Sequence, residues 1–237
     1  MRYCMGILKG SCAVFAAAFL ITGCHHDTRN YEVEVVNLTQ NQPFSPLAVV
    51  LHDSGYAPWT IGSTASQGLE LLSESGDNSQ FLDEAAENLS REALINAHGR
   101  MSRVSGEGLI LPGESEAVQT SVGGYEILLS LATMLVNTND GYAGVEAFDI
   151  SDLEVGEEMT RFLTMYDAGT EGNSELASSI PGPAAGGEGF NVARDDVNYV
   201  AHHPGVVSSV DGYTDSALDQ SHRFDNPAAL LVVRRIE

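Results

Sequence analysis

Residues 31–39 read YEVEVVNLT, and this short stretch decides the fold class. Its first large apolar side chains, Tyr31, Val33 and Val35, stand at every second position, with a glutamate in each of the two gaps. Because successive side chains of a strand point to opposite faces of a sheet, this period predicts a β-strand with one buried face. We therefore expect a strand-rich chain whose first element is half-buried.

Further strand-like segments follow at intervals marked by turn residues. LAVVLHD (47–53) is a continuous apolar run that fits a buried strand, and the turn-rich NQPFSP precedes it. The later candidates are LILPGESEAVQTSV (109–122), YEILLSLATMLV (125–136), YAGVEAFDI (142–150), MTRFLTMYD (159–167) and AALLVVRRI (228–236). About seven strands at such intervals, with one at each end, predict a mainly β fold, an antiparallel β-sandwich.

Two segments depart from this strand pattern. In residues 64–97, leucine, phenylalanine and alanine recur at spacings of three and four, which predicts a two-helix insertion. We expect Ser79 to cap the second helix, Gly99 to end it, and the pair to pack over one end or face of a sheet. Residues 169–219 are rich in Gly, Ser, Asp and Pro and predict a long ordered loop. Such loops are uncommon without a functional reason.

The N-terminus has the pattern of an export signal. Arg2 and Lys9 precede an apolar run, 11–22, that is too short to span a bilayer. The run ends in LITGC, which resembles the bacterial lipobox, so we expect cleavage before Cys24 and lipidation of that cysteine. His25 follows and, by resemblance to enterobacterial lipoproteins, favours the outer membrane or cell surface, with the periplasm as an alternative. A membrane anchor, or an ordinary signal peptide with a chance cysteine, is the other interpretation.

The expected domain organisation follows from this signal. Residues 1–23 form the lipoprotein signal peptide, 24–30 a polar tether and 31–237 one β-sandwich domain. Cys4 and Cys12 lie in the signal, so cleavage would leave no disulfide framework and no thiolate metal site.

Charge is the strongest compositional signal. The chain has 11 basic and 33 acidic residues and a formal net charge of −22. Such a field repels nucleic acid and anionic lipid, so we expect no nucleic-acid partner. It attracts cations. Solubility in high salt is an alternative explanation, because screening relieves the self-repulsion of an acidic chain.

Two acidic turns follow predicted strands. LVNTNDGYAG (135–144) places Asp140 after one strand, and MYDAGTEGN (165–173) places Asp167 and Glu171 after another. If both strands leave the same end of the sandwich, three carboxylates meet there, and calcium takes about six to eight oxygen ligands. The alternatives are a plain hairpin turn for NDG, whose residues are usual in turns, and a solvated loop for DAGTEGN. The spacing of an EF-hand is absent.

Four motifs carry a resemblance to a known family. They are PFSPLAVVLHD (43–53), LATMLVNTND (131–140), YDAGTEGN (166–173) and IPGPAAGGEGF (180–190). In this order they are similar to the spondin N-terminal domain family as it occurs in bacterial exported proteins, and the similarity extends over residues 31–236. The resemblance implies a C2-like antiparallel β-sandwich with one calcium ion at a loop end. The animal relatives are extracellular-matrix and cell-adhesion proteins.

The resemblance also implies the metal ligands. The family's calcium carboxylates carry over to Asp140, Asp167 and Glu171, where glutamate replaces the second aspartate of the animal motif. Bacterial members often have a cysteine in the IPGP region, whereas this chain has Ala184 and Ala185. The loop must therefore be held in some other way.

Together these features predict an exported, lipid-anchored, non-enzymatic module for adhesion or interaction, with one structural calcium ion (Ca2+). Its expected partner is a protein or glycan at the cell envelope, and its only membrane contact is the N-terminal lipid. One alternative is a calcium-dependent carbohydrate- or lipid-binding module, and another is a glycan or ester hydrolase. The sequence lacks a G-x-S-x-G elbow, and the His52, Asp53 and Ser54 of one short loop cannot close a triad. A zinc site at His202 and His203 is disfavoured, because adjacent histidines rarely point the same way.

Overall fold

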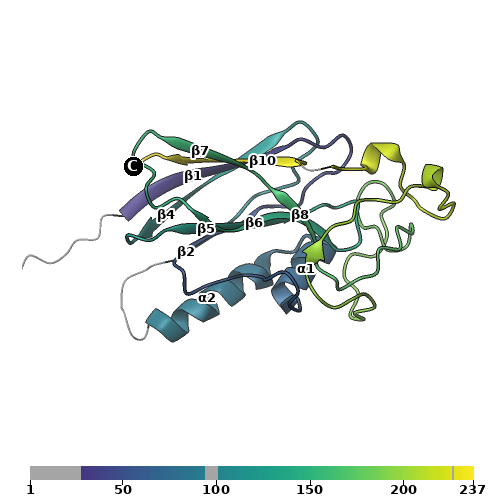
Figure 1. Ribbon diagram of the computed structural model, residues 1–237, viewed down its shortest axis with the longest axis horizontal. Coiled ribbons are helices and arrows are strands. Elements are labelled where there is room, and N and C mark those ends of the chain that lie inside the picture. Colours follow the sequence, from purple (N-terminus) through teal and green to yellow (C-terminus); the bar gives the residue numbers. More distant parts are fainter. Residues whose placement is uncertain (1–27, 94–100, 226) are drawn as a thin grey trace, which may run out of the picture.

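Two antiparallel sheets face each other in a sandwich, and two helices lie under one of them (Figure 1). The computed structural model describes residues 28–93, 101–225 and 227–237. The strands are β1 (Thr28–Asn37), β2 (Ala48–His52), β3 (Ser102–Ser105), β4 (Ser115–Gly123), β5 (Leu128–Met134), β6 (Gly141–Asp149), β7 (Glu158–Phe162), β8 (Thr164–Asp167), β9 (Ala201–His202) and β10 (Ala229–Arg235). The helices are α1 (Gln67–Ser75), α2 (Ser79–Ala93) and two short 3-10 turns, η1 (Ser209–Asp211) and η2 (Gln220–His222).

The order of the strands confirms the predicted antiparallel sandwich. The four-stranded sheet has the order β4-β1-β10-β7, and the six-stranded sheet has the order β3-β2-β5-β6-β8-β9. Every pair of neighbouring strands is antiparallel. The first and last strands, β1 and β10, pair with each other at the centre of the smaller sheet.

The main core lies between the two sheets. Tyr31, Val33 and Val35 of β1 are fully buried there and share one apolar cluster with Leu129 and Leu131 of β5. The glutamates between these β1 residues face outward, where both bond the guanidinium of a β10 arginine. The alternating pattern of the opening stretch is thus the pattern of a strand with one buried face.

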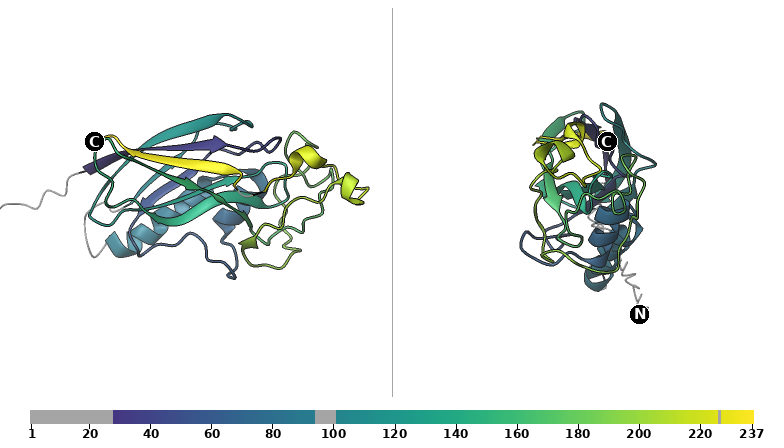
Figure 2. Two further views of the ribbon diagram at one scale, coloured as in Figure 1. Left: turned by 45° about the horizontal axis from the view of Figure 1, so that its top comes forward. Right: turned by 90° about the vertical axis from the view of Figure 1, so that its right-hand side faces the viewer.

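A second apolar core lies between the six-stranded sheet and the two helices. The helices cover the outer face of this sheet (Figure 2). Leu69 and Leu72 of α1 and Phe81 of α2 pack there with Trp59 and with Val50 of β2. Because apolar layers lie on both faces of this sheet, every residue of β2 is buried. This explains the continuous apolar run LAVVLHD and confirms that the two helices pack on the face of a sheet.

The helix ends differ in part from the expectation. α2 begins at Ser79, so the predicted capping residue is its first helical residue. The capping oxygen comes instead from Asp77, whose Oδ1 accepts the Ser79 N–H at 2.9 Å. The Asn78 side chain is occupied elsewhere, because its amide donates to the Leu47 carbonyl at 2.9 Å. The predicted end at Gly99 lies outside the described residues.

Two other boundaries depart from the expectation. MTRFLTMYD, expected as one strand, is divided between β7 of the smaller sheet and β8 of the larger one. The chain passes between the sheets at Leu163, whose N–H bonds the Ala229 carbonyl at 3.0 Å. β1 begins at Thr28, so residues 28–30 of the expected tether belong to this strand. The predicted signal peptide and Cys24 lie outside the described residues.

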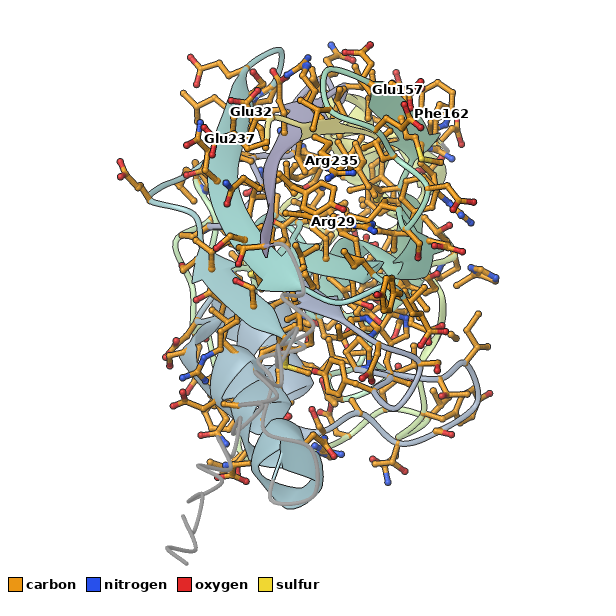
Figure 3. The ribbon with its side chains drawn as sticks, turned by 90° about the vertical axis from the view of Figure 1, so that its left-hand side faces the viewer. Arg29, Glu32, Glu157, Phe162, Arg235 and Glu237 are labelled. Atoms are coloured by element: carbon orange, nitrogen blue, oxygen red, sulfur yellow. The ribbon has the colours of Figure 1, made fainter. Side chains whose placement is uncertain are left out.

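The long loop between β8 and β10 gathers at one end of the sandwich, as Figures 1 and 2 show. It contains β9, η1 and η2, and it begins where β8 ends. Figure 3 views the opposite end, where Arg29 of β1 and Arg235 of β10 lie close together. These two side chains donate to the carbonyls of Ser151 and Leu153, at 2.6 and 3.0 Å, and fix the loop between β6 and β7.

Candidate metal centre

Asp140 and Asp167 lie side by side at the loop end of the larger sheet. Asp167 is the last residue of β8, and it pairs in register with Gly141, the first residue of β6. Asp140 precedes Gly141 in the tight turn that joins β5 to β6. The Thr138 hydroxyl supports this turn by accepting the Gly141 N–H at 2.9 Å. The sheet register therefore brings together two of the three predicted carboxylates.

The Asp140 carboxylate is fully buried and only half satisfied. Its Oδ2 accepts three hydrogen bonds, from the Thr170 N–H at 2.7 Å, the Glu171 N–H at 3.1 Å and the Thr170 hydroxyl at 3.2 Å. Its Oδ1 is buried without a hydrogen-bond partner. Burial, and then the charge of Asp167, raise the pKa of Asp140 to about 8. Without a bound cation, the Asp140 carboxyl is therefore largely protonated at neutral pH.

Asp167 anchors the start of the long loop. Its Oδ1 accepts the Gly169 N–H at 2.8 Å, and its Oδ2 accepts the Asn173 amide at 2.6 Å. Burial raises the pKa of Asp167 although both hydrogen bonds favour the ionised form. Gly169 has a φ of 68°, and a Cβ there would collide with the Tyr199 backbone. Only glycine fits position 169 of this turn, which explains the glycine of the DAGT motif.

Glu171 donates its backbone N–H to Asp140 of this pair, and its carboxylate lies near Asn139. Burial raises the pKa of Glu171 to about 7, and the charges of Glu74, Asp195 and Glu188 add to the shift. Among residues 28–93, 101–225 and 227–237, no three His, Cys, Asp or Glu side chains are grouped closely enough to hold a metal ion. The structure thus brings Asp140 and Asp167 together, and Glu74 is the acid whose charge acts most strongly on Glu171.

The donor set nevertheless fits a calcium ion. Asp140 and Asp167 are adjacent buried carboxylates with raised pKa values, and Asp140 has an unpartnered oxygen. Calcium prefers carboxylate, amide and carbonyl oxygens and tolerates irregular loop geometry. Asp140 and Asp167 would supply the first two ligands. Sequence reasoning missed the polar neighbours Thr170 and Glu74, because a threonine inside the motif and a glutamate in a helix carry no metal-site pattern.

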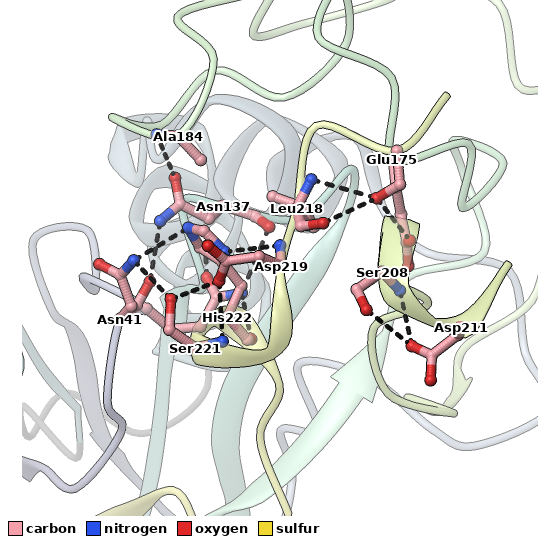
Figure 4. A network of polar contacts seen from close by, with 12 residues as sticks. Asn41, Asn137, Glu175, Ala184, Ser208, Asp211, Leu218, Asp219, Ser221 and His222 are labelled. Carbon is pink, nitrogen blue, oxygen red and sulfur yellow. Dashed lines mark hydrogen bonds and ion pairs between the residues drawn. The ribbon is translucent and has the colours of Figure 1, made fainter. Parts of the chain in front are cut away.

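The long loop is held by side-chain amides in place of a cysteine (Figure 4). Asn137 Oδ1 accepts the Ala184 N–H at 3.0 Å, and its amide donates to the Asn41 carbonyl at 2.9 Å. The Asn41 amide in turn donates to the Ser221 hydroxyl at 3.0 Å and lies 3.0 Å from His222 Nε2. This network joins the loop to the β1–β2 and β5–β6 connections. Hydrogen bonds therefore hold the loop in this chain, which has Ala184 in the region where bacterial family members often have a cysteine.

A second polar network fixes the later part of the loop. Glu175 is buried, and its Oε1 accepts the Val207 N–H at 2.7 Å. Its Oε2 accepts the Ser216 hydroxyl at 3.4 Å. Both oxygens of this carboxylate therefore have partners, in contrast to those of Asp140.

One histidine is paired with a serine, but the pair is buried. His52 Nε2 lies 2.8 Å from the Ser130 hydroxyl, and Nδ1 lies 2.7 Å from the Asp53 carbonyl. His52 is 1% exposed and Ser130 is fully buried, so a substrate does not reach them. Ser130 also lies at the register shift between β5 and β6. Its hydroxyl accepts the N–H of Ala147, which has a φ of 50°.

The protein is an antiparallel β-sandwich whose buried acidic side chains lie at the loop end of the larger sheet. The sequence matches the family model described as Spondin_N over residues 29–183, more than half of the chain, and the chain belongs to this family. The match includes Asp140, Asp167 and Glu171. It ends within the long loop, whereas the resemblance of the motifs was expected to extend to residue 236. No curated protein is significantly similar to the chain.

Family membership suggests an extracellular or secreted module for adhesion or interaction. The family is not a known enzyme family, which suggests a non-enzymatic role. Within the part of the chain that the structure describes, no helix has the length and apolar composition needed to cross a membrane.

Proposed function

We propose that this chain is an exported, calcium-binding, non-enzymatic module that acts in adhesion or interaction at the cell surface, anchored by a lipid on Cys24. One observation carries the calcium assignment. The Asp140 carboxylate is fully buried beside Asp167, and one of its oxygens has no partner. A buried, uncompensated carboxylate pair is costly, and a bound cation removes the cost.

One calcium ion at this position has a structural role in the proposal. When bound, the ion would offset the repulsion between Asp140 and Asp167, with Glu171 as the third carboxylate. Asp140 belongs to the β5–β6 turn, and Asp167 and Glu171 flank the start of the long loop. The ion would therefore tie these two segments together at the end of the sandwich.

The adhesion role is supported by the family. Its proposed partner is a protein or glycan at the cell envelope. The net charge of −22 disfavours nucleic acid and anionic lipid as partners, so the lipid on Cys24 would be the only membrane contact.

Thermal unfolding of the chain from His25 onward tests the calcium assignment. Calcium at 100 times its dissociation constant stabilises the folded state by about 2.7 kcal/mol, which raises the midpoint of a domain of this size by about 5 to 11 °C. Magnesium at matched ionic strength should give a smaller rise, and Asp167→Asn should abolish the response to calcium. Equal responses to both metals, unchanged in the variant, would show that the acidic loop end binds ions only diffusely.

The anchor is tested separately by metabolic labelling with a fatty acid in cells that make the full chain. The wild-type protein should incorporate label and remain with the membrane fraction, and Cys24→Ser should do neither. Label in the Cys24→Ser protein would refute the assignment of this cysteine.

A further inference from the structure

Glu74 is a fully buried carboxylate at the unfavourable end of a helix. It lies in the last turn of α1, which has no basic residue, so it faces the negative end of the helix dipole. Glu70, one turn earlier on the same helix face, is also an acid, and like charges at this spacing repel each other. Neither the sequence of α1 nor its helix dipole therefore offsets the negative charge of Glu74.

The groups around Glu74 leave one of its oxygens unpaired. Its Oε2 accepts the Asn191 N–H at 3.0 Å, whereas Oε1 is buried and accepts no hydrogen bond. The Thr170 hydroxyl is near enough to lower the pKa of Glu74, but it donates its proton to Asp140 Oδ2 at 3.2 Å. Thr170 thus lies between two carboxylates and satisfies only one of them.

The arginine whose charge acts on Glu74 is already engaged in another ion pair. Arg194 forms a two-pronged ion pair with Glu70, with Nε–Oε1 at 2.9 Å and Nη2–Oε2 at 2.6 Å. A third donor bond, to the Ala65 carbonyl at 3.1 Å, fixes the guanidinium in this position. Of the charges that act on Glu74, that of Arg194 has a weaker effect than the repulsion from Glu70.

Glu74 also acts electrostatically on Glu171, the third predicted metal ligand. Among the charges that act on Glu171, that of Glu74 is the largest. Glu171 is 6% exposed and Glu74 is fully buried, so this is a buried pair of acids. The pair lies against the loop residues that bond Asp140, because Thr170 and Glu171 both donate to Asp140 Oδ2. Unpartnered oxygens thus lie in two neighbouring acidic pairs.

We propose that Glu74 supplies a fourth carboxylate to the calcium site, so that the ion joins helix α1 to the loop end of the sandwich. This inference rests on the calcium function proposed above. It assigns a role to the helix insertion, whose last turn carries a binding group as well as an apolar face. The ion would then tie together three segments: the last turn of α1, the β5–β6 turn and the start of the long loop.

Calorimetric calcium titration of Glu74→Gln tests the proposal. The variant keeps the acceptor for the Asn191 N–H and removes the charge. We expect its calcium affinity to fall about tenfold or more, while its melting midpoint in chelator stays equal to that of the wild type or rises. The matched control is Glu175→Gln, because Glu175 is also a buried glutamate with a raised pKa but has partners on both oxygens. Its affinity should stay within about twofold of the wild type.

The outcomes separate this inference from the proposed function. If Asp140→Asn abolishes binding and Glu74→Gln binds as the wild type does, the role of Glu74 is refuted and the calcium site stands. If the wild-type chain binds no calcium, both proposals fall. A second measurement needs no variant: calcium should increase the protection of amides 72–76 against hydrogen exchange. Unchanged protection there would also refute the role of Glu74.

Discussion

Raising the pH should destabilise the calcium-free protein, because Asp140 must then ionise inside the fold. Burial and the neighbouring Asp167 raise the pKa of Asp140 from 3.8 to about 8. Between these two values the folded chain holds a proton that the unfolded chain has released. The stabilisation from this group is therefore complete below the unfolded pKa and is lost as the pH rises through the folded pKa.

The size of the effect follows from the two pKa values. Between pH 6.5 and pH 8, Asp140 alone lowers the free energy of unfolding by about 2 kcal/mol. The pKa of Glu171, raised by burial from 4.5 to about 7, adds about 1 kcal/mol in the same direction. Together they lower the melting midpoint by about 5 to 10 °C. Burial lowers the pKa of His203 to about 4, so its opposite contribution is nearly complete at pH 6.5, where this window begins.

Melting curves in chelator at half-unit steps from pH 6.5 to pH 8 measure this fall. Asp140→Asn should remove about two thirds of it, because an amide has no proton to lose in this range. Saturating calcium should remove most of it as well, because the ion replaces the proton on the same oxygens. A midpoint in chelator that stays level or rises over this range would refute the reasoning. An undiminished fall in Asp140→Asn would show that other groups cause it.

Three further substitutions test how the fold supports the site. Gly169→Ala should destabilise the protein by about 2 kcal/mol or more and weaken its response to calcium, because φ is 68° and the new Cβ collides with Tyr199; melting curves with and without calcium measure both effects. Arg194→Met should cost about 3 kcal/mol, because it leaves Glu70 buried without its ion pair; the double variant with Glu70→Gln should recover most of this loss in urea unfolding. Leu131→Ala removes a fully buried side chain between the two sheets and should cost about 2 to 5 kcal/mol in the same assay, with calcium affinity unchanged.

The sandwich could be predicted because its strongest signals are local. The alternation of Tyr31, Val33 and Val35 marks a half-buried strand wherever the strand lies, and the periodicity of residues 64–97 marks helices. The division of MTRFLTMYD into β7 and β8 could not be predicted in this way. Both halves favour strand, and the point of exchange depends on the bond between Leu163 and Ala229, which are far apart in sequence. Pairing between distant segments leaves no periodic trace in either of them.

The acidic site could be predicted only in part, for similar reasons. Asp140 and Asp167 are adjacent because turns at the ends of antiparallel strands meet at a sheet end. The direction of the Glu171 carboxylate could not be read from the motif, since its longer side chain has more rotamers. Glu74 has no metal-site pattern in the sequence, but it has an electrostatic one. An acid in the last turn of a helix, four residues after another acid, is unfavourable twice over, and such a conflict commonly marks a functional position.

The way in which the loop end satisfies its polar groups is itself an argument for an ion. Asn137 and Glu175 hold other parts of the loop, and both side chains have partners at each polar end. Two fully buried carboxylates, Asp140 and Glu74, each keep one oxygen without a partner, and both lie beside Thr170. Folded proteins leave few buried polar groups unsatisfied. Asn137 and Glu175 show that side chains in this loop end can pair their polar atoms, and the proposed cation, bound between the helix and the loop, would give these two oxygens a partner.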